Sequence, residues 1–166
     1  DATGAPFVLA VSSGTSALHL ALLLAGVRPD DEVLTQAFTF VATANAISYC
    51  GASPHFCDIE ETHFGIDVAK LTDHLEDVAR REGGSVVNRR TGRRIAAVLP
   101  MHTFGHPSDI LPLLDVAESW GLPVVEDAAE GLGSYVGDRH VGTFGLMGTL
   151  SFNGNKIVTT GGGGAI

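Results

Sequence analysis

IAAVLPMHTFGHPSDILPLLDVAESWGLPVVED, residues 95–127, contains a strand, a helix and a second strand in one continuous run. Residues 95–99 are wholly apolar, which is typical of a strand in a parallel sheet that is covered on both faces. Ser108 or Asp109 can cap the helix that follows, and apolar residues recur along that helix at helical spacing. Residues 122–125 form the second predicted strand. The stretch therefore predicts one unit of a parallel α/β sheet.

The same alternation extends in both directions along the chain. Helices are predicted at residues 16–26, 40–50 and 67–80, and strands at residues 32–36, 53–57 and 150–152. Short connections between such segments predict an α/β fold of three layers, with a doubly wound, mostly parallel sheet between helices. The arginine- and glycine-rich residues 80–94 are predicted to form an insertion loop. Because ligands of such sheets collect at the carboxyl ends of the strands, we expect Asp127 in the functional zone.

Composition narrows the class of protein. A formal charge of -9 argues against nucleic-acid binding, and the arginines of residues 80–94 are expected to be solvated. No apolar run approaches the ~20 residues of a membrane span, and no signal peptide is recognisable. Cys50 and Cys57 lack a metal-binding spacing. We expect a cytoplasmic protein without a metal site. The chain starts without Met and stops within a predicted strand, so we also expect it to be a piece of a longer protein.

Lys156 is one of only two lysines in the chain, and it lies in SFNGNK, between a predicted strand and a glycine run. Burial among small, uncharged residues lowers the pKa of a lysine, and the neutral amine can then attack a carbonyl to form a Schiff base. The alternative interpretation is a surface lysine in a glycine-rich loop. Other segments of the chain favour the first interpretation.

A phosphate site is predicted at SSGTS, residues 12–16, where an apolar helix begins. A helix N-terminus offers free N–H groups and a partial positive charge. Gly14 allows close approach of the backbone, and Thr15 and Ser16 add hydroxyl donors. The alternative is simple N-capping by serine or threonine.

Two further residues match the parts of a planar cofactor. Asp127 follows an apolar strand and could pair with a protonated ring nitrogen, or it could be an ordinary acid at a strand end. Phe40, in TFVAT, could stack on a flat ring, or it could be a core phenylalanine. Together with the phosphate cradle and Lys156, these residues predict a pyridoxal 5'-phosphate site.

The motifs SGTSALHLAL, TFVATANAI, VVEDAAE and SFNGNK together resemble the DegT/DnrJ/EryC1/StrS sugar aminotransferases, which are fold type I enzymes that use pyridoxal phosphate. The resemblance covers nearly the whole chain. PMHTFGHP and SFNGNKIVTTGGGG are similar to the LegC-like group, which also shares the absence of an acid from the glycine run at residues 161–164. The resemblance implies that residues 1–166 are the cofactor-binding large domain, without an N-terminal segment and a small C-terminal domain.

The resemblance also implies roles for particular residues. Lys156 would hold the cofactor and shuttle a proton, Asp127 would keep the pyridine nitrogen protonated, and Phe40 would stack on the ring. The phosphate would be bound by Gly14, Thr15, Ser16 and Ser151. Glu130 would lie near the phenolic oxygen of the cofactor.

The implied reaction is transfer of an amino group, with glutamate as donor, to a nucleotide-linked keto-sugar. Glu130 is similar to the perosamine-type and LegC-type enzymes, which favours transfer to C4 of a UDP-linked 4-keto-6-deoxy N-acetylhexosamine, as in legionaminic acid and polysaccharide biosynthesis. The alternatives are a C3-specific aminotransferase and a non-catalytic protein that binds sugar nucleotides. The resemblance implies a homodimer. His102 is either a contact in the sugar pocket or a structural loop residue, and zinc binding with His106 is not expected.

Overall fold

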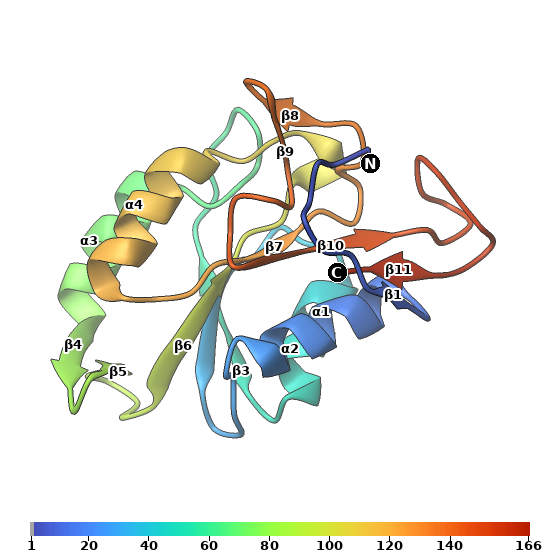
Figure 1. The fold of residues 1–166 in the computed structure, drawn as a ribbon. Helices are drawn as coiled ribbons and strands as arrows, with labels where there is room; N and C mark the ends of the chain where they lie inside the picture. The colour runs from blue at the N-terminus through green and yellow to red at the C-terminus, as the bar shows by residue number, and fades with distance from the viewer. Residues whose placement is uncertain (1) are drawn as a thin grey trace.

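The computed structural model describes residues 2–166, and a twisted sheet with helices on both sides is its central feature (Figure 1). The helices are α1 (Gly14–Leu24), α2 (Val41–Tyr49), α3 (Val68–Val78) and α4 (Ile110–Trp120), with a short 3-10 turn, η1 (Thr103–Gly105). The strands are β1 (Ala10–Val11), β2 (Glu32–Gln36), β3 (Ser53–Cys57), β4 (Ala79–Glu82), β5 (Ser85–Asn88), β6 (Arg94–Leu99), β7 (Val125–Asp127), β8 (Tyr135–Val136), β9 (Arg139–His140), β10 (Met147–Ser151) and β11 (Gly164–Ala165).

Two ladders of strands meet at the centre of the molecule. One ladder has the order β3-β2-β6 and continues into β5 and β4, and the other has the order β7-β10-β11-β1. Parallel bridges join β6 to β7, at Val98 with Val124 and at Met101 with Asp127. Strands β3, β2, β6, β7 and β10 run parallel to one another, whereas β5 runs antiparallel to β6 and β11 runs antiparallel to both β10 and β1. The prediction of a mostly parallel sheet is confirmed.

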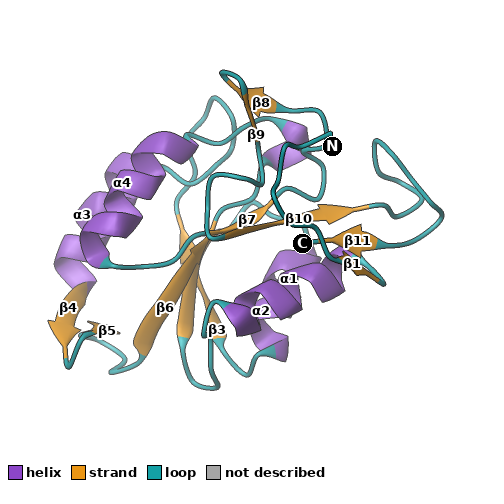
Figure 2. Ribbon diagram, in the orientation of Figure 1, coloured by secondary structure: helices purple, strands orange, loops and turns teal. Residues whose placement is uncertain are grey.

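Helices cover both faces of the sheet, as the predicted three layers require. Figure 2 shows α1 and α2 on one side of the strands and α3 and α4 on the other. Neighbouring residues of β6 point to opposite faces: Val98 packs in the core under α3 and α4, and Leu99 packs in the core under α1 and α2. Burial on both faces explains why residues 95–99 contain no polar side chain.

Strands β7 and β10 differ most from their predicted bounds. Strand β7 occupies Val125–Asp127, not residues 122–125, because Gly121 caps the end of α4 in the left-handed conformation (φ 71°) and Pro123 has no N–H for a ladder. Asp127 is therefore the last residue of the strand. Strand β10 begins at Met147, earlier than the predicted residue 150, because the glycines before Leu150 hide the strand pattern.

Residues 79–88 form a β-hairpin where a helix end and a loop were predicted. Strands β4 and β5 pair across Gly83 and Gly84, which both have positive φ, and β5 pairs with the first residues of β6. Arg80 and Arg90 are exposed and pair with Glu82 and Asp77, as expected of solvated arginines, whereas Arg94 is half-buried in β6 and pairs with the buried Asp31. Among the helices of residues 2–166, none combines the length and the apolar character that a membrane span requires.

Candidate active site

A cavity of about 290 Å³ opens at the carboxyl ends of β7 and β10, beside the first turn of α1. Strands β7 and β10 are parallel neighbours, with Asp127 opposite Thr149, so Asp127 and the later Ser151 reach the same edge of the sheet. The predicted residues that line the cavity are Gly14, Thr15, Phe40, Asp127, Glu130, Ser151 and Lys156. The fold therefore brings together seven residues that are separated by up to 142 positions in the sequence (156 − 14).

The carboxylate of Asp127 is buried at the floor of the cavity. Its Oδ2 atom accepts a hydrogen bond from Thr43 Oγ1 at 2.7 Å, and Oδ1 accepts one from the N–H of Ala129 at 3.1 Å. Burial raises the pKa of Asp127 above its usual value, and these two hydrogen bonds only partly oppose that effect. A cation in the cavity, such as a protonated ring nitrogen, would compensate the buried charge.

The amine of Lys156 points into the cavity and not into solvent. Its side chain is only 11% exposed, and Nζ donates to Glu130 Oε1 at 3.0 Å. Nζ also lies 5.5 Å from the centre of the Phe40 ring. The surface-lysine alternative is therefore wrong for the geometry of this residue. Phe40 is 62% exposed at the start of α2, so it is no core phenylalanine.

The start of α1 packs tightly on the end of β10. A Cβ atom on Gly14 would lie 2.7 Å from Cβ of Ser151, so only glycine allows this approach. Ser13 caps the helix, because its Oγ accepts from the N–H of Ser16 at 3.0 Å. Capping of α1 by Ser13 is thus compatible with the predicted phosphate site, since Gly14 and Thr15 line the cavity.

Ser16 is the one predicted cofactor residue that does not line the cavity. Its hydroxyl lies 3.0 Å from the hydroxyls of both Ser12 and Ser13, and those two serines line the cavity instead. The phosphate role of Ser16 stays a prediction. The remaining residues of the cavity that the sequence did not single out are Leu18, Ala42, Thr43, Met101, Ala129, Asn153, Asn155, Gly162 and Gly163.

Thr43 could have been found from the sequence. It follows Phe40 by three positions in TFVAT, and residues at that spacing share one face of a helix. The asparagines carry no comparable signal, because their places depend on the path of the loop after β10.

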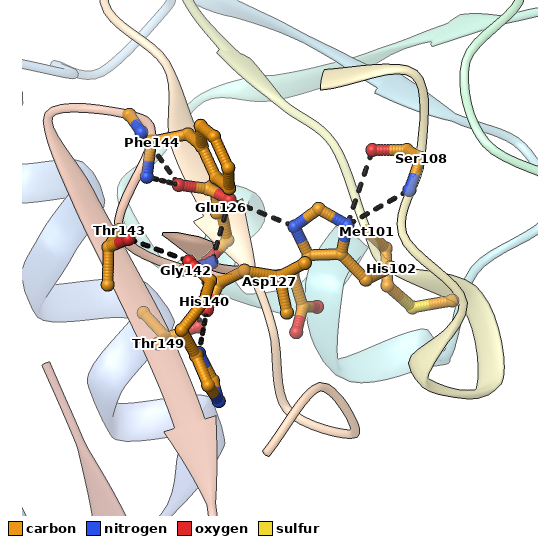
Figure 3. Close-up of polar contacts among 12 residues, drawn as sticks. Met101, His102, Ser108, Glu126, Asp127, His140, Gly142, Thr143, Phe144 and Thr149 are labelled. Carbon is orange, nitrogen blue, oxygen red and sulfur yellow. Dashed lines mark hydrogen bonds and ion pairs between the residues drawn. The ribbon is translucent and has the colours of Figure 1, made fainter. Parts of the chain in front are cut away.

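His102 is fully buried, and its ring lies between Glu126 and Ser108 (Figure 3). It contacts Glu126 and Ser108 and does not line the cavity, so the structural alternative holds for this histidine. Across residues 2–166, His, Cys, Asp and Glu side chains form no group of three that could hold a metal ion.

The cavity fits pyridoxal phosphate by its chemistry. It has a buried anion for a ring nitrogen, a largely shielded amine for a carbonyl, and a helix N-terminus with closely packed glycine and serine for a phosphate. Together with the α/β fold, these groups define the class of pyridoxal-phosphate-dependent transferases. More specifically, the chain belongs to the DegT/DnrJ/EryC1/StrS aminotransferase family, whose model matches residues 1–166.

Curated relatives and solved structures agree with this assignment. The chain is 39% identical to the GDP-perosamine synthase of Caulobacter vibrioides, over 100% of this chain and 40% of that protein. It is 34% identical to the UDP-N-acetyl-3-dehydro-alpha-D-glucosamine 3-aminotransferase of Acidithiobacillus ferrooxidans, over 93% of this chain and 38% of that protein. The structure superposes on NtdA from Bacillus subtilis, solved with bound cofactor PMP, with a TM-score of 0.78 and 32% identity. That match covers 96% of this chain and 32% of NtdA.

The chain thus spans about 40% of the length of the first of these relatives. The predicted fold class, a partial large domain of an aminotransferase of this type, is confirmed by the superposition.

Proposed function

We propose that the full-length protein is a pyridoxal-phosphate-dependent aminotransferase that acts on nucleotide-linked keto-sugars. One observation carries the proposal: Lys156 and Asp127, from different parts of the chain, line the same cavity as the glycine and serine at the start of α1 and the end of β10. A non-catalytic sugar-nucleotide binder would need neither a largely shielded amine nor a buried carboxylate in that place.

Each part of the cofactor has a matching group in the cavity. Gly14, Thr15 and Ser151 would bind the phosphate, with Ser16 one position further along α1. Asp127 would bind the pyridine nitrogen and Phe40 would cover one face of the ring. When bound, the cofactor supplies an electron sink, which allows an amino group to leave a donor and join a ketone.

Three side chains would control protons during the reaction. Asp127 would keep a proton on the ring nitrogen, because its buried carboxylate is stabilised by a cationic partner. Lys156 would carry a proton to and from the reacting carbon. Glu130 accepts a hydrogen bond from Lys156 Nζ and so would hold the amine in place between transfers.

For the substrate we propose glutamate as donor and C4 of a UDP-linked 4-keto-6-deoxy N-acetylhexosamine as acceptor. Glu130 and the motif PMHTFGHP support this choice and the LegC-like group. The name of the Caulobacter relative denotes a perosamine synthase, whereas that of the Acidithiobacillus relative denotes a 3-aminotransferase. Transfer to C3 is therefore the second candidate. We also propose a homodimer in the cytoplasm and a place in polysaccharide biosynthesis.

Product analysis tests this proposal. The full-length protein is incubated with glutamate, pyridoxal phosphate and a panel of UDP- and GDP-linked 3-keto and 4-keto sugars, and NMR then locates the new C–N bond. A bond at C4 of a UDP-linked N-acetyl sugar supports the proposal. A bond at C3 overturns the regiochemistry, and no product with any sugar overturns the function.

A further inference from the structure

Glu126 directly precedes Asp127 on β7, but its side chain points to the other face of the strand and away from the cavity. The carboxylate is fully buried. Four donors reach it, two on each oxygen: His102 Nε2 at 3.0 Å and Gly142 N at 2.8 Å on Oε2, and Phe144 N and Gly145 N at 2.6 Å on Oε1 (Figure 3). Although burial would raise the pKa of Glu126, the hydrogen bonds from His102 and these backbone groups hold the pKa below its usual value.

The hydrogen bonds of His102 define its tautomer. Ring atom Nδ1 faces the N–H of Ser108 at 3.1 Å, and an N–H can only donate, so Nδ1 carries no proton. The ring proton is therefore on Nε2, from which it is donated to Glu126. Exchange of the tautomer would cost both hydrogen bonds at once.

His102 and Glu126 hold the two segments that surround Asp127. On one side, the N–H of Asp127 donates to Pro100 O at 2.8 Å, and the N–H of His102 donates to Asp127 O at 3.0 Å. His102 thus binds Glu126 through its ring and Asp127 through its backbone N–H.

On the other side, Glu126 accepts hydrogen bonds from the N–H groups of Gly142, Phe144 and Gly145, in the segment that leads into β10. Strand β10 ends at Ser151, five residues before Lys156. The segment is closely packed, since a Cβ atom on Gly145 would lie 2.5 Å from Val124 O. The Glu126 carboxylate therefore links two segments. One holds the backbone of Asp127, and the other leads through β10 to Ser151 and Lys156.

We propose that Glu126 and His102 act as a positioning pair, which fixes Asp127 relative to Ser151 and Lys156 without touching the cofactor. The inference rests on the proposed function, because it assigns the pair to the geometry of that cofactor site. Small displacements of such groups are costly, since binding and catalysis require placement to within about 0.5 Å.

Glu126→Gln tests the carboxylate, and Glu32→Gln is the matched control. Glu32 is also buried and binds three partners, His55, Asn88 and Thr91, but it lies at the first residue of β2, away from the cavity. In Glu126→Gln an amide NH₂ replaces one acceptor oxygen and faces donors that have no other partner. The full-length variants are compared by urea unfolding and by titration with pyridoxal phosphate, followed by absorbance.

Both variants are expected to unfold at lower urea concentration than the wild type. Only Glu126→Gln is expected to weaken pyridoxal phosphate binding, by roughly tenfold to a hundredfold, while Glu32→Gln changes it by less than about twofold. Folded Glu126→Gln with the affinity of the wild type would overturn the positioning role. Failure of the wild type itself to bind pyridoxal phosphate would instead overturn the proposed function.

A pair of His102 variants decides the question if Glu126→Gln does not fold. In His102→Gln, the amide nitrogen can replace Nε2 as the donor to Glu126. In His102→Asn, the shorter amide can replace only Nδ1, as the acceptor for the N–H of Ser108. The positioning role predicts pyridoxal phosphate affinity near that of the wild type for His102→Gln and clearly weaker affinity for His102→Asn. Equal affinities in the two variants would contradict it.

Discussion

The Nζ atom of Lys156 lies 3.0 Å from Oε1 of Glu130, and both side chains line the cavity at the edge of the sheet. Lys156 belongs to the loop after β10, whereas Glu130 follows β7, so the ion pair joins two neighbouring parallel strands at their carboxyl ends. The pair is largely shielded from solvent on the lysine side, which favours a defined position of the amine. A mobile surface lysine would lack that constraint.

The Glu130 carboxylate is expected to matter for catalysis more than for cofactor binding. Glu130→Gln retains the size of the side chain but loses the negative charge beside Lys156, so proton transfer by the amine should become less efficient. We expect kcat of the full-length enzyme to fall by roughly a hundredfold, with pyridoxal phosphate affinity changed little. Steady-state kinetics with glutamate and the keto-sugar measure this effect. Glu61→Gln, at an exposed glutamate, is the control and should leave kcat unchanged.

Asp127 is expected to destabilise the cofactor-free protein at neutral pH. Burial raises its pKa in the folded state, so the unfolded chain loses this proton first as pH rises. The folded state is then penalised above about pH 4, where an unfolded aspartate ionises. Asp127→Asn removes the buried charge, and we expect it to raise stability relative to the wild type at pH 7 while it weakens cofactor binding.

Chemical denaturation of the cofactor-free, full-length protein between pH 3 and pH 7 tests whether the Asp127 carboxylate lowers the free energy of unfolding as pH rises. The gain in stability from Asp127→Asn should grow as pH rises through the interval between the unfolded and the raised folded pKa of Asp127, and should vanish below about pH 3. A gain that is largest at acidic pH would show that the carboxylate is not held in a charge-disfavouring environment.

Gly14 is expected to tolerate no side chain. In Gly14→Ala the new Cβ atom would lie 2.7 Å from Cβ of Ser151, so α1 would have to move away from β10. We expect a loss of about 1–3 kcal/mol in the free energy of unfolding and a marked loss of pyridoxal phosphate affinity. Gly154→Ala, where no atom lies within 4 Å of the new Cβ, is the control. The double variant with Ser151→Gly should recover stability; if it does not, the contact with Ser151 is not the cause.

The sheet and its four helices could be predicted because the signals are local. Residues 95–99 are apolar on both faces, and the helices have caps or regular apolar spacing. The hairpin at residues 79–88 was missed because arginines and glycines obscure its alternation, although Val86 packs in the core. The start of β7 was placed too early because apolar residues after α4 look like strand before the ladder begins.

The candidate site was predictable where chemistry and motif agree, as for Lys156, Asp127 and Gly14. The Glu126–His102 pair was not, because residues 24 positions apart meet only through the pairing of β7 with the segment after β6. Ser16 is the residue whose place was least predictable: its hydroxyl lies beside the hydroxyls of Ser12 and Ser13, which line the cavity in its stead, and its phosphate role stays a prediction.

The central claim is that Lys156 is the residue that would bind pyridoxal phosphate covalently. Absorbance of the full-length protein during titration with pyridoxal phosphate tests it most directly, together with Lys156→Ala and the control Lys70→Ala. Lys70 is the other lysine of this chain, 58% exposed and paired with Asp58. After unbound pyridoxal phosphate is removed, we predict a visible absorption band in the wild type and in Lys70→Ala that is absent in folded Lys156→Ala. An undiminished band in Lys156→Ala would contradict the account.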